Sequence, residues 1–179
     1  SGDWTVCTTI RDARALRRDR EWIEQIYDEY LGDLAAGHTG VFPSLTITGQ
    51  GIAELLQGWF NDDRSMPFMI LRDERPAGFA LVQRERAPPG SGSAHYRLTE
   101  FFIRRPHRRL GVGRGAAQLL LSRFAGEWII AEQEQNPGAV SFWRRVITEF
   151  TQGDYSEHQA YGEVAHRFVS AGGSRGQAR

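Results

Sequence analysis

A cluster of arginines and glycines is the part of this sequence best suited to chemistry. It reads Arg108-Arg109-Leu110-Gly111-Val112-Gly113-Arg114-Gly115. The apolar run Phe101-Phe102-Ile103 before it predicts a strand, and Pro106 marks the end of that strand because proline cannot donate to a sheet ladder. Apolar residues at helical spacing follow the cluster. The cluster therefore lies at the entrance of a predicted helix.

A glycine-rich helix entrance surrounded by arginines can bind a polyphosphate. Glycine lets the backbone approach a ligand closely, and the first N–H groups of a helix have no acceptor within the helix. Those groups and the helix dipole favour an anion. The sequence therefore predicts an anion-binding loop at residues 108–115.

Two motifs in this chain resemble those of the GNAT superfamily of acetyl-CoA-dependent N-acetyltransferases. In that family Arg or Gln is followed, after two residues, by Gly-x-Gly or Gly-x-Ala, and here Arg108 is followed by Gly111 and Gly113. The later segment Asn136-Pro-Gly-Ala-Val-Ser-Phe-Trp143 is similar to the family's Asn-x-x-Ala-x-x-Phe-Tyr helix. The two motifs have the family's order and spacing, and they cover roughly the second half of the chain.

The resemblance implies where acetyl-CoA binds. In the family two central strands splay apart and the pantetheine arm lies in the gap. Backbone groups of Phe102 and Ile103 would pair with pantetheine, and one of their amides would stabilise charge on the thioester oxygen. The other implied cofactor contacts are the pyrophosphate-binding amides of Gly111, Val112, Gly113 and Arg114, the cationic side chains of Arg108 and Arg109, and the side chain of Asn136.

Acetyl transfer to an amine also requires a base, because an alkylammonium group with a pKa of about 10 must first lose its proton. Glu100 is the best candidate, since it interrupts an apolar strand three residues before Ile103. Burial among apolar neighbours would raise its pKa into a useful range. The alternative is an edge-facing or ion-paired glutamate.

The acid that would protonate the leaving thiolate is harder to predict. Trp143 stands where many family members have a tyrosine, and indole is not a proton-transfer acid near neutral pH. Tyr155 and His158 are possible replacements, although each could be an ordinary strand or loop residue. Solvent could also assist the thiolate. Because Trp143 replaces the usual tyrosine, the chain could instead be a non-catalytic module that binds acyl-CoA.

The resemblance places the acceptor opposite CoA, near residues 38–49, Trp59 and residues 156–161. Phe42, Trp59 and Tyr161 would provide aromatic walls, and Glu157 would attract a cationic amine. These residue types suit the primary amine of a small molecule, an amino acid or a peptide equally well.

A Rossmann dinucleotide-binding turn is the main alternative. Gly111-x-Gly113-x-x-Ala116 fits a permitted fingerprint, and Glu132 lies at a plausible distance to bind a ribose. Against NAD(P) binding, Pro106 and several arginines separate the strand from the glycines. Too little chain follows to build the remaining βαβ units.

Composition narrows the class of protein. The chain has 179 residues and a mass of 20.2 kDa, and its 22 basic and 22 acidic side chains cancel. This balance argues against a surface built for nucleic acid or anionic lipid. The single cysteine excludes a disulfide framework and a Cys-rich zinc site, and no other ligand spacing predicts a metal. No apolar run is long enough to span a membrane. We expect a cytoplasmic monomer or homodimer.

Periodicity predicts a mixed α/β chain of the α+β type. We expect a strand at 4–10, a helix over 22–34 capped by Asp12 and stopped by Gly37, and a second helix over 52–60. A hairpin of 67–71 and 77–82 should follow, with final strands near 149–156 and 163–169. Residues 1–169 should form a single domain, followed by a disordered tail at 170–179. The GNAT resemblance implies a central twisted, mostly antiparallel sheet with splayed central strands and flanking helices.

Overall fold

The computed structural model describes residues 5–35 and 51–173. Within these ranges the chain forms four α-helices and a seven-stranded sheet. The elements in chain order are β1 (Thr8–Asp12), α1 (Arg17–Ala35), α2 (Ile52–Asn61), β2 (Ser65–Arg72), β3 (Arg75–Glu85), β4 (His95–Ile103), the short 3₁₀ helix η1 (Arg105–His107), α3 (Val112–Arg123), β5 (Gly126–Gln133), α4 (Pro137–Thr151), β6 (Ser156–Ala160) and β7 (Glu163–Ser170).

The strands pair in the order β1-β2-β3-β4-β5-β7-β6. Every neighbouring pair is antiparallel except β4 and β5, which are parallel. This confirms the predicted mixed α+β class with a mostly antiparallel sheet. Because only one pair of the described strands is parallel, the alternative of a Rossmann fold is wrong for this chain.

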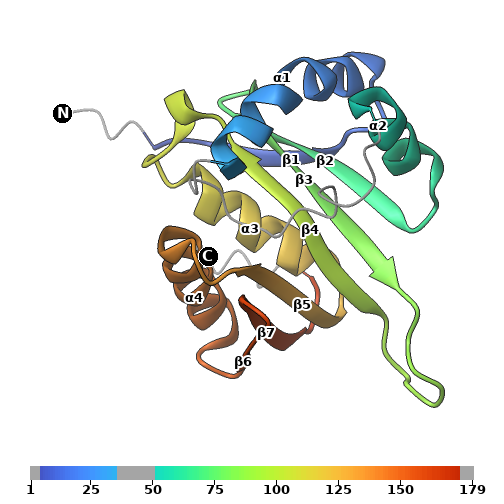
Figure 1. Ribbon diagram of the computed structural model, residues 1–179, viewed down its shortest axis with the longest axis vertical. Helices are drawn as coiled ribbons and strands as arrows, with labels where there is room; N and C mark the ends of the chain where they lie inside the picture. The colour runs from blue at the N-terminus through green and yellow to red at the C-terminus, as the bar shows by residue number, and fades with distance from the viewer. Residues whose placement is uncertain (1–4, 36–50, 174–179) are drawn as a thin grey trace.

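Helices cover both faces of the sheet, as Figure 1 shows. One face packs against α1 and α2 through a core that includes Tyr27, Tyr30 and Phe102. The other packs against α3 and α4 through a second core that includes Phe101 and Trp143. Successive residues of a strand point to opposite faces, so the neighbours Phe101 and Phe102 supply different cores.

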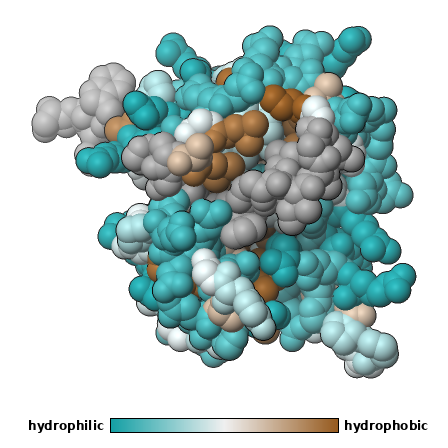
Figure 2. All heavy atoms as spheres, viewed as in Figure 1, coloured by the Kyte–Doolittle hydropathy of each residue, from teal (hydrophilic) through white to brown (hydrophobic). Residues whose placement is uncertain are grey.

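The surface is mostly hydrophilic on the face drawn in Figure 2, with hydrophobic residues gathered over α1 and towards α2. Leu31, Leu34 and Leu55 of these helices are only partly buried. None of the described helices is long and apolar enough to cross a membrane.

A bulge in β4 separates its two halves. Glu100 lies opposite Leu81, but Leu98 lies opposite the next residue, Val82, so Thr99 is one residue too many on β4. The Thr99 hydroxyl donates to the Leu81 carbonyl at 3.2 Å. An extra residue reverses the alternation of side chains. Leu98 therefore faces α3 and α4, whereas Glu100 faces α1.

The pairing of β4 with β5 ends at this bulge. Residues 95–98 of β4 pair with residues 127–130 of β5, and no pair joins the two strands beyond Leu98 and Ile130. β4 nevertheless continues to Ile103 on β3, and β5 continues to Gln133 on β7. The two strands diverge in Figure 1. The gap between them is the splay that the sequence resemblance implied.

The hairpin and both early helices agree with the sequence predictions. β2 and β3 form the hairpin through a turn at Asp73 and Glu74, whose φ angles are 48° and 66°. α1 and α2 contain the predicted apolar stripes at 22–34 and 52–60.

Four predicted boundaries were wrong. The strand expected at 4–10 is β1, which spans Thr8–Asp12, and residues 5–7 before it are not in a strand. Asp12 does not cap α1: it ends β1 and accepts a bond from the Arg14 amide at 2.8 Å, and the helix begins at Arg17. The strand expected near 149–156 is the last three residues of α4 followed by a turn, and β6 starts at Ser156. Ser170, expected in the tail, ends β7, where its hydroxyl donates to the Leu121 carbonyl at 2.6 Å.

Residues 36–50, including Gly37 and Phe42, lie outside the described residues, as do residues 174–179.

We predict that Gly78→Ala destabilises the protein. A methyl group at Gly78 would lie 1.9 Å from the Phe102 carbonyl oxygen, so the paired ends of β3 and β4 would have to move apart. We expect a loss of about 2 kcal/mol or more in the free energy of unfolding, measured by denaturant titration. Gly58→Ala in α2 is the matched control, because no atom lies within 4 Å of its added methyl. It should stabilise by about 0.5–1 kcal/mol. Equal stabilities for the two variants would contradict the prediction.

Candidate active site

A groove of about 520 Å³ lies between the first turns of α3 and α4, beside the end of β4. It brings together residues from both sequence motifs. The predicted cofactor residues that line it are Ile103, Arg108, Arg109, Gly111, Gly113 and Arg114. The α4 segment contributes Phe142 and Trp143 on the opposite wall.

The glycines shape one wall of this groove. Gly111 is the N-cap of α3, with φ of 79°, a left-handed conformation that glycine adopts without strain. A methyl at Gly113 would be 3.4 Å from the Phe142 ring, in close contact with α4. Val112 between them is buried in the core. The helix thus directs its first N–H groups into the groove with little side chain in front of them.

The four arginines near the groove have different environments. Arg114 forms an ion pair with Glu149 at 2.7 Å, and Arg108 is bonded to Asp33 of α1. Arg109 is exposed and forms no ion pair with the described residues. The same holds for Arg145 of α4, which also lines the groove. The sequence analysis missed Arg145, although its position two residues after Trp143 on the motif helix was a usable signal.

Asn136 organises the opposite wall. It is the N-cap of α4, and its side-chain oxygen accepts from the Ala139 amide at 3.2 Å. Pro137 follows at the first helical position, where its missing N–H costs nothing. Trp143 is fully buried, with its ring in edge contact with Phe101 at 5.0 Å. Trp143 therefore packs the core as well as lining the groove.

Beyond the end of its pairing with β5, β4 directs alternate backbone amides into the gap. The Arg104 amide donates to Ala77 of β3 at 2.8 Å, so it points towards β3. N–H groups alternate in direction along a strand, and the Ile103 amide and carbonyl therefore point the other way. By the same alternation the Phe102 amide points to β3. Of the two predicted amides, Ile103 is the one that faces the gap.

Glu100 lies on the α1 face of the sheet and is fully buried. The Tyr30 hydroxyl donates to its carboxylate. Burial raises the pKa of Tyr30 well above its ordinary value, and the nearby Glu100 charge raises it further. The pKa of Tyr27 is raised for the same two reasons. Both phenols therefore stay protonated at physiological pH, and Tyr30 remains a donor to Glu100.

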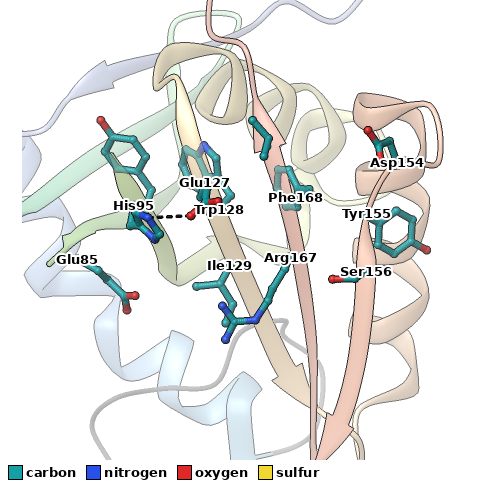
Figure 3. Close-up of a pocket in the computed structure, with 12 residues that line it drawn as sticks. Glu85, His95, Glu127, Trp128, Ile129, Asp154, Tyr155, Ser156, Arg167 and Phe168 are labelled. Atoms are coloured by element: carbon teal, nitrogen blue, oxygen red, sulfur yellow. Dashed lines mark ion pairs between the residues drawn. The ribbon is translucent and has the colours of Figure 1, made fainter. Parts of the chain in front are cut away.

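Tyr155 lies away from the groove. Its hydroxyl is 3.5 Å from the Thr148 hydroxyl in the last turn of α4, whereas the groove is at the first turn. Tyr155 also lines a second hollow of about 460 Å³ at the starts of β4 and β5, drawn in Figure 3. His95 and Glu127 form an ion pair at 2.7 Å there. The structure does not bring Tyr155 next to Glu100 and Ile103, and His158 is on the outer strand β6.

The residues predicted to contact the acceptor are not gathered at one place. Trp59 is buried in the core beside Tyr27. Glu157 is on the α4 side of the sheet, the face opposite Glu100, and both its oxygens bind Arg144 at 2.7 Å. Tyr161 is fully exposed between β6 and β7. Phe42 lies outside the described residues.

Comparison with known proteins identifies the family. The model of the acetyltransferase (GNAT) family matches residues 23–147. The chain belongs to the GNAT acetyltransferase family. No curated protein sequence matches this GNAT chain significantly.

Solved structures of low sequence identity share the GNAT fold. An acetyltransferase from Thermus thermophilus is 17% identical with a TM-score of 0.60, over 92% of this chain and 97% of the other. The ribosomal-protein-S18-alanine N-acetyltransferase of Escherichia coli is 12% identical with a TM-score of 0.57, over 94% and 97%. An aminoglycoside acetyltransferase from an uncultured soil metagenomic sample is 13% identical with a TM-score of 0.59, over 89% and 94%.

A buried polar network supports the α4 wall of this GNAT domain. Glu132 of β5 and His166 of β7 are fully buried and bond to each other. The other His166 ring nitrogen lies 3.3 Å from Glu157, which Arg144 holds. Burial raises the pKa of Glu132 to about 7, although the bond to His166 opposes this shift. No group of His, Cys, Asp and Glu among the described residues could hold a metal ion.

We predict that stability depends on pH through Glu132. Its pKa is higher in the folded protein than in the unfolded chain, so the folded state binds the proton more tightly. Its contribution is therefore present below about pH 4.5 and is lost as pH rises through about 7. Relative to Glu132→Gln, the wild type should lose on the order of 1–3 kcal/mol of unfolding free energy between about pH 5 and about pH 8.

Glu157→Gln is the control for this measurement, because Arg144 lowers the pKa of Glu157. Its contribution has the opposite sign and is lost as pH falls. Parallel stability curves for wild type and Glu132→Gln would show that Glu132 does not titrate in this range.

Proposed function

We propose that this GNAT acetyltransferase moves an acetyl group from acetyl-CoA to a primary amine by direct transfer in a ternary complex. The observation that carries the proposal is the position of the Ile103 amide. It faces the gap between β4 and β5, with the groove on one face of the sheet and Glu100 on the other. One strand end thus separates a site for the acyl donor from a candidate base.

The groove suits the phosphates and pantetheine arm of acetyl-CoA. The first N–H groups of α3 and the cations Arg109 and Arg145 would hold the phosphates. Arg114 would contribute mainly through its backbone amide, because its side chain binds Glu149. The Ile103 amide would donate to the thioester oxygen as charge develops on it. Bound acetyl-CoA supplies an activated acyl group.

Glu100 would accept the proton of the attacking amine, directly or through water. The amine nitrogen then bonds to the acetyl carbon and loses its second proton to solvent, the carbon–sulfur bond breaks, and the thiolate takes up a proton from solvent. Tyr30 orients the carboxylate through its hydrogen bond. Because the hydroxyl of Tyr30 stays protonated, it fixes the carboxylate and does not compete for the amine proton.

The thiolate can leave without a tyrosine acid. An ordinary thiol has a pKa of about 8–9, so a thiolate near neutral pH is a competent leaving group that can take its proton from water. We therefore propose solvent as the proton source in place of the tyrosine that Trp143 replaces, and we do not assign Tyr155 to the mechanism. The acceptors named for two structural neighbours, the alanine of a ribosomal protein and aminoglycosides, carry amines. We propose that the acceptor of this chain is also an amine.

We predict that acetyl-CoA binding depends on Arg109 and Arg145. Calorimetric titration of the double variant Arg109→Ala, Arg145→Ala should show an affinity at least about tenfold below that of wild type, because two phosphate-facing cations are lost. Arg123→Ala is the control, since Arg123 ends α3 at the opposite end from Gly111. No binding of acetyl-CoA to the wild type would reject the proposed cosubstrate.

We predict that Glu100→Gln lowers turnover at least about a hundredfold with an amine that the wild type acetylates, because the base is removed. Its affinity for acetyl-CoA, measured by calorimetry, should stay close to that of the wild type. An amine panel, read by release of free thiol, identifies a usable acceptor. Binding without turnover of any amine would favour the alternative of an acyl-CoA-binding module, which the buried Trp143 makes a specific candidate.

A further inference from the structure

Arg108, the first residue of the glycine motif, points away from the phosphates. Its Nε donates to the Ile103 carbonyl at 2.7 Å, and its Nη2 bonds to Asp33 of α1. The guanidinium also lies over the Phe102 ring, 5.7 Å from the centroid. The side chain therefore runs past the end of β4 to the α1 face. Binding a phosphate would require it to give up both partners, whereas Arg109 and Arg145 are exposed.

We infer that Arg108 is a positioning residue: it sets the orientation of Ile103, whose amide would polarise the thioester carbonyl. This inference rests on the proposed function. A carbonyl held at a fixed point defines the orientation of its residue, and the N–H of the same residue points to the same side of the strand. The pairing of β4 with β5 ends at Leu98, so none of the described strands pairs with the gap side of Ile103.

Asp33 of α1 is the second partner of the Arg108 guanidinium. It is 8% exposed, close to the end of α1, and Arg105 approaches it only to 3.8 Å. A charge-assisted, two-pronged bond from one planar guanidinium fixes geometry better than a single contact. Arg108 thereby ties three parts together: the loop before α3, the end of β4 and α1. The position of the acyl-polarising amide thus depends on α1.

The structure provides a matched control for this inference. Arg104 and Glu29 form another ion pair between the same loop and α1, at 3.1 Å, with side chains that are 35% and 36% exposed against 25% and 11% for Arg108 and Asp33. Arg104 is four residues before Arg108, and Glu29 is four residues before Asp33. The Arg104 side chain bonds to Glu29 and not to the Ile103 carbonyl. Arg104→Met therefore removes a comparable pair without releasing Ile103.

The test uses infrared difference spectroscopy of acetyl-CoA that is isotope-labelled at the thioester carbonyl, bound to the full chain. Hydrogen bonding to Ile103 should lower the carbonyl stretching frequency below that of free acetyl-CoA. Arg108→Met should move the band back towards the free value, while calorimetric affinity stays within about threefold of wild type. Arg108→Lys should restore part of the shift, because an ammonium can reach one of the two acceptors. Arg104→Met should leave the band unchanged.

Arg109→Ala should give the converse result, with weaker binding and an unchanged band in the complex that remains. Asp33→Asn provides a second route if Arg108→Met fails to fold, and it should move the band in the same direction by a smaller amount.

A band that stays in place in Arg108→Met and in Asp33→Asn would overturn the inference. So would a loss of affinity in Arg108→Met that equals the loss in Arg109→Ala. A wild type that binds acetyl-CoA without a band shift would reject the role of Ile103 but leave the cosubstrate in place. A wild type that fails to bind would reject the proposed function itself.

Discussion

The extra residue at Thr99 is the constraint on which the rest of the site depends. It occurs where the pairing of β4 with β5 ends, so the strand that begins as an interior member of the sheet finishes with one side free. It also reverses the faces of the residues that follow. Without it, Glu100 would share the face of Leu98 and point into the core beneath α3 and α4. A single backbone irregularity thus opens the gap and directs an acid to its other side.

The two faces of the sheet carry different chemical groups beside that gap. The α3 and α4 face has the glycine loop and exposed cations, which suit an anionic ligand. The α1 face has a buried carboxylate bonded to a tyrosine, an arrangement that suits proton transfer and not the binding of an anion. Arg108 is the side chain that passes from one to the other. The motif arginines therefore divide into those that stay exposed at the groove and one that supports the framework.

Local patterns predicted the elements well, because they depend on neighbours in sequence. The stripe of α1, the hairpin of β2 and β3, and the glycine-rich entrance of α3 all followed from spacing and residue type. Asn136 was predicted only as a cofactor contact, and its role as the N-cap of α4 was missed. Interactions between distant segments could not be predicted in this way. Nothing near Arg108 indicates that Asp33, seventy-five residues earlier, is its partner. Thr99 resembles any strand residue, so the bulge was invisible. Glu157 looked available for an amine until the register of β6 placed it against Arg144.

The position of β1 has a consequence for the order in which the chain assembles. β2, β3 and β4 are consecutive and pair as a meander, so their contacts close short loops. β1 reaches β2 only after the whole segment that contains α1 and α2 has been enclosed, which carries a larger entropy cost. The meander should therefore form first, and α1 should dock onto a sheet that already exists. Tyr30 and Asp33 would then join their partners late, making the proposed catalytic framework one of the last parts of the molecule to form during folding.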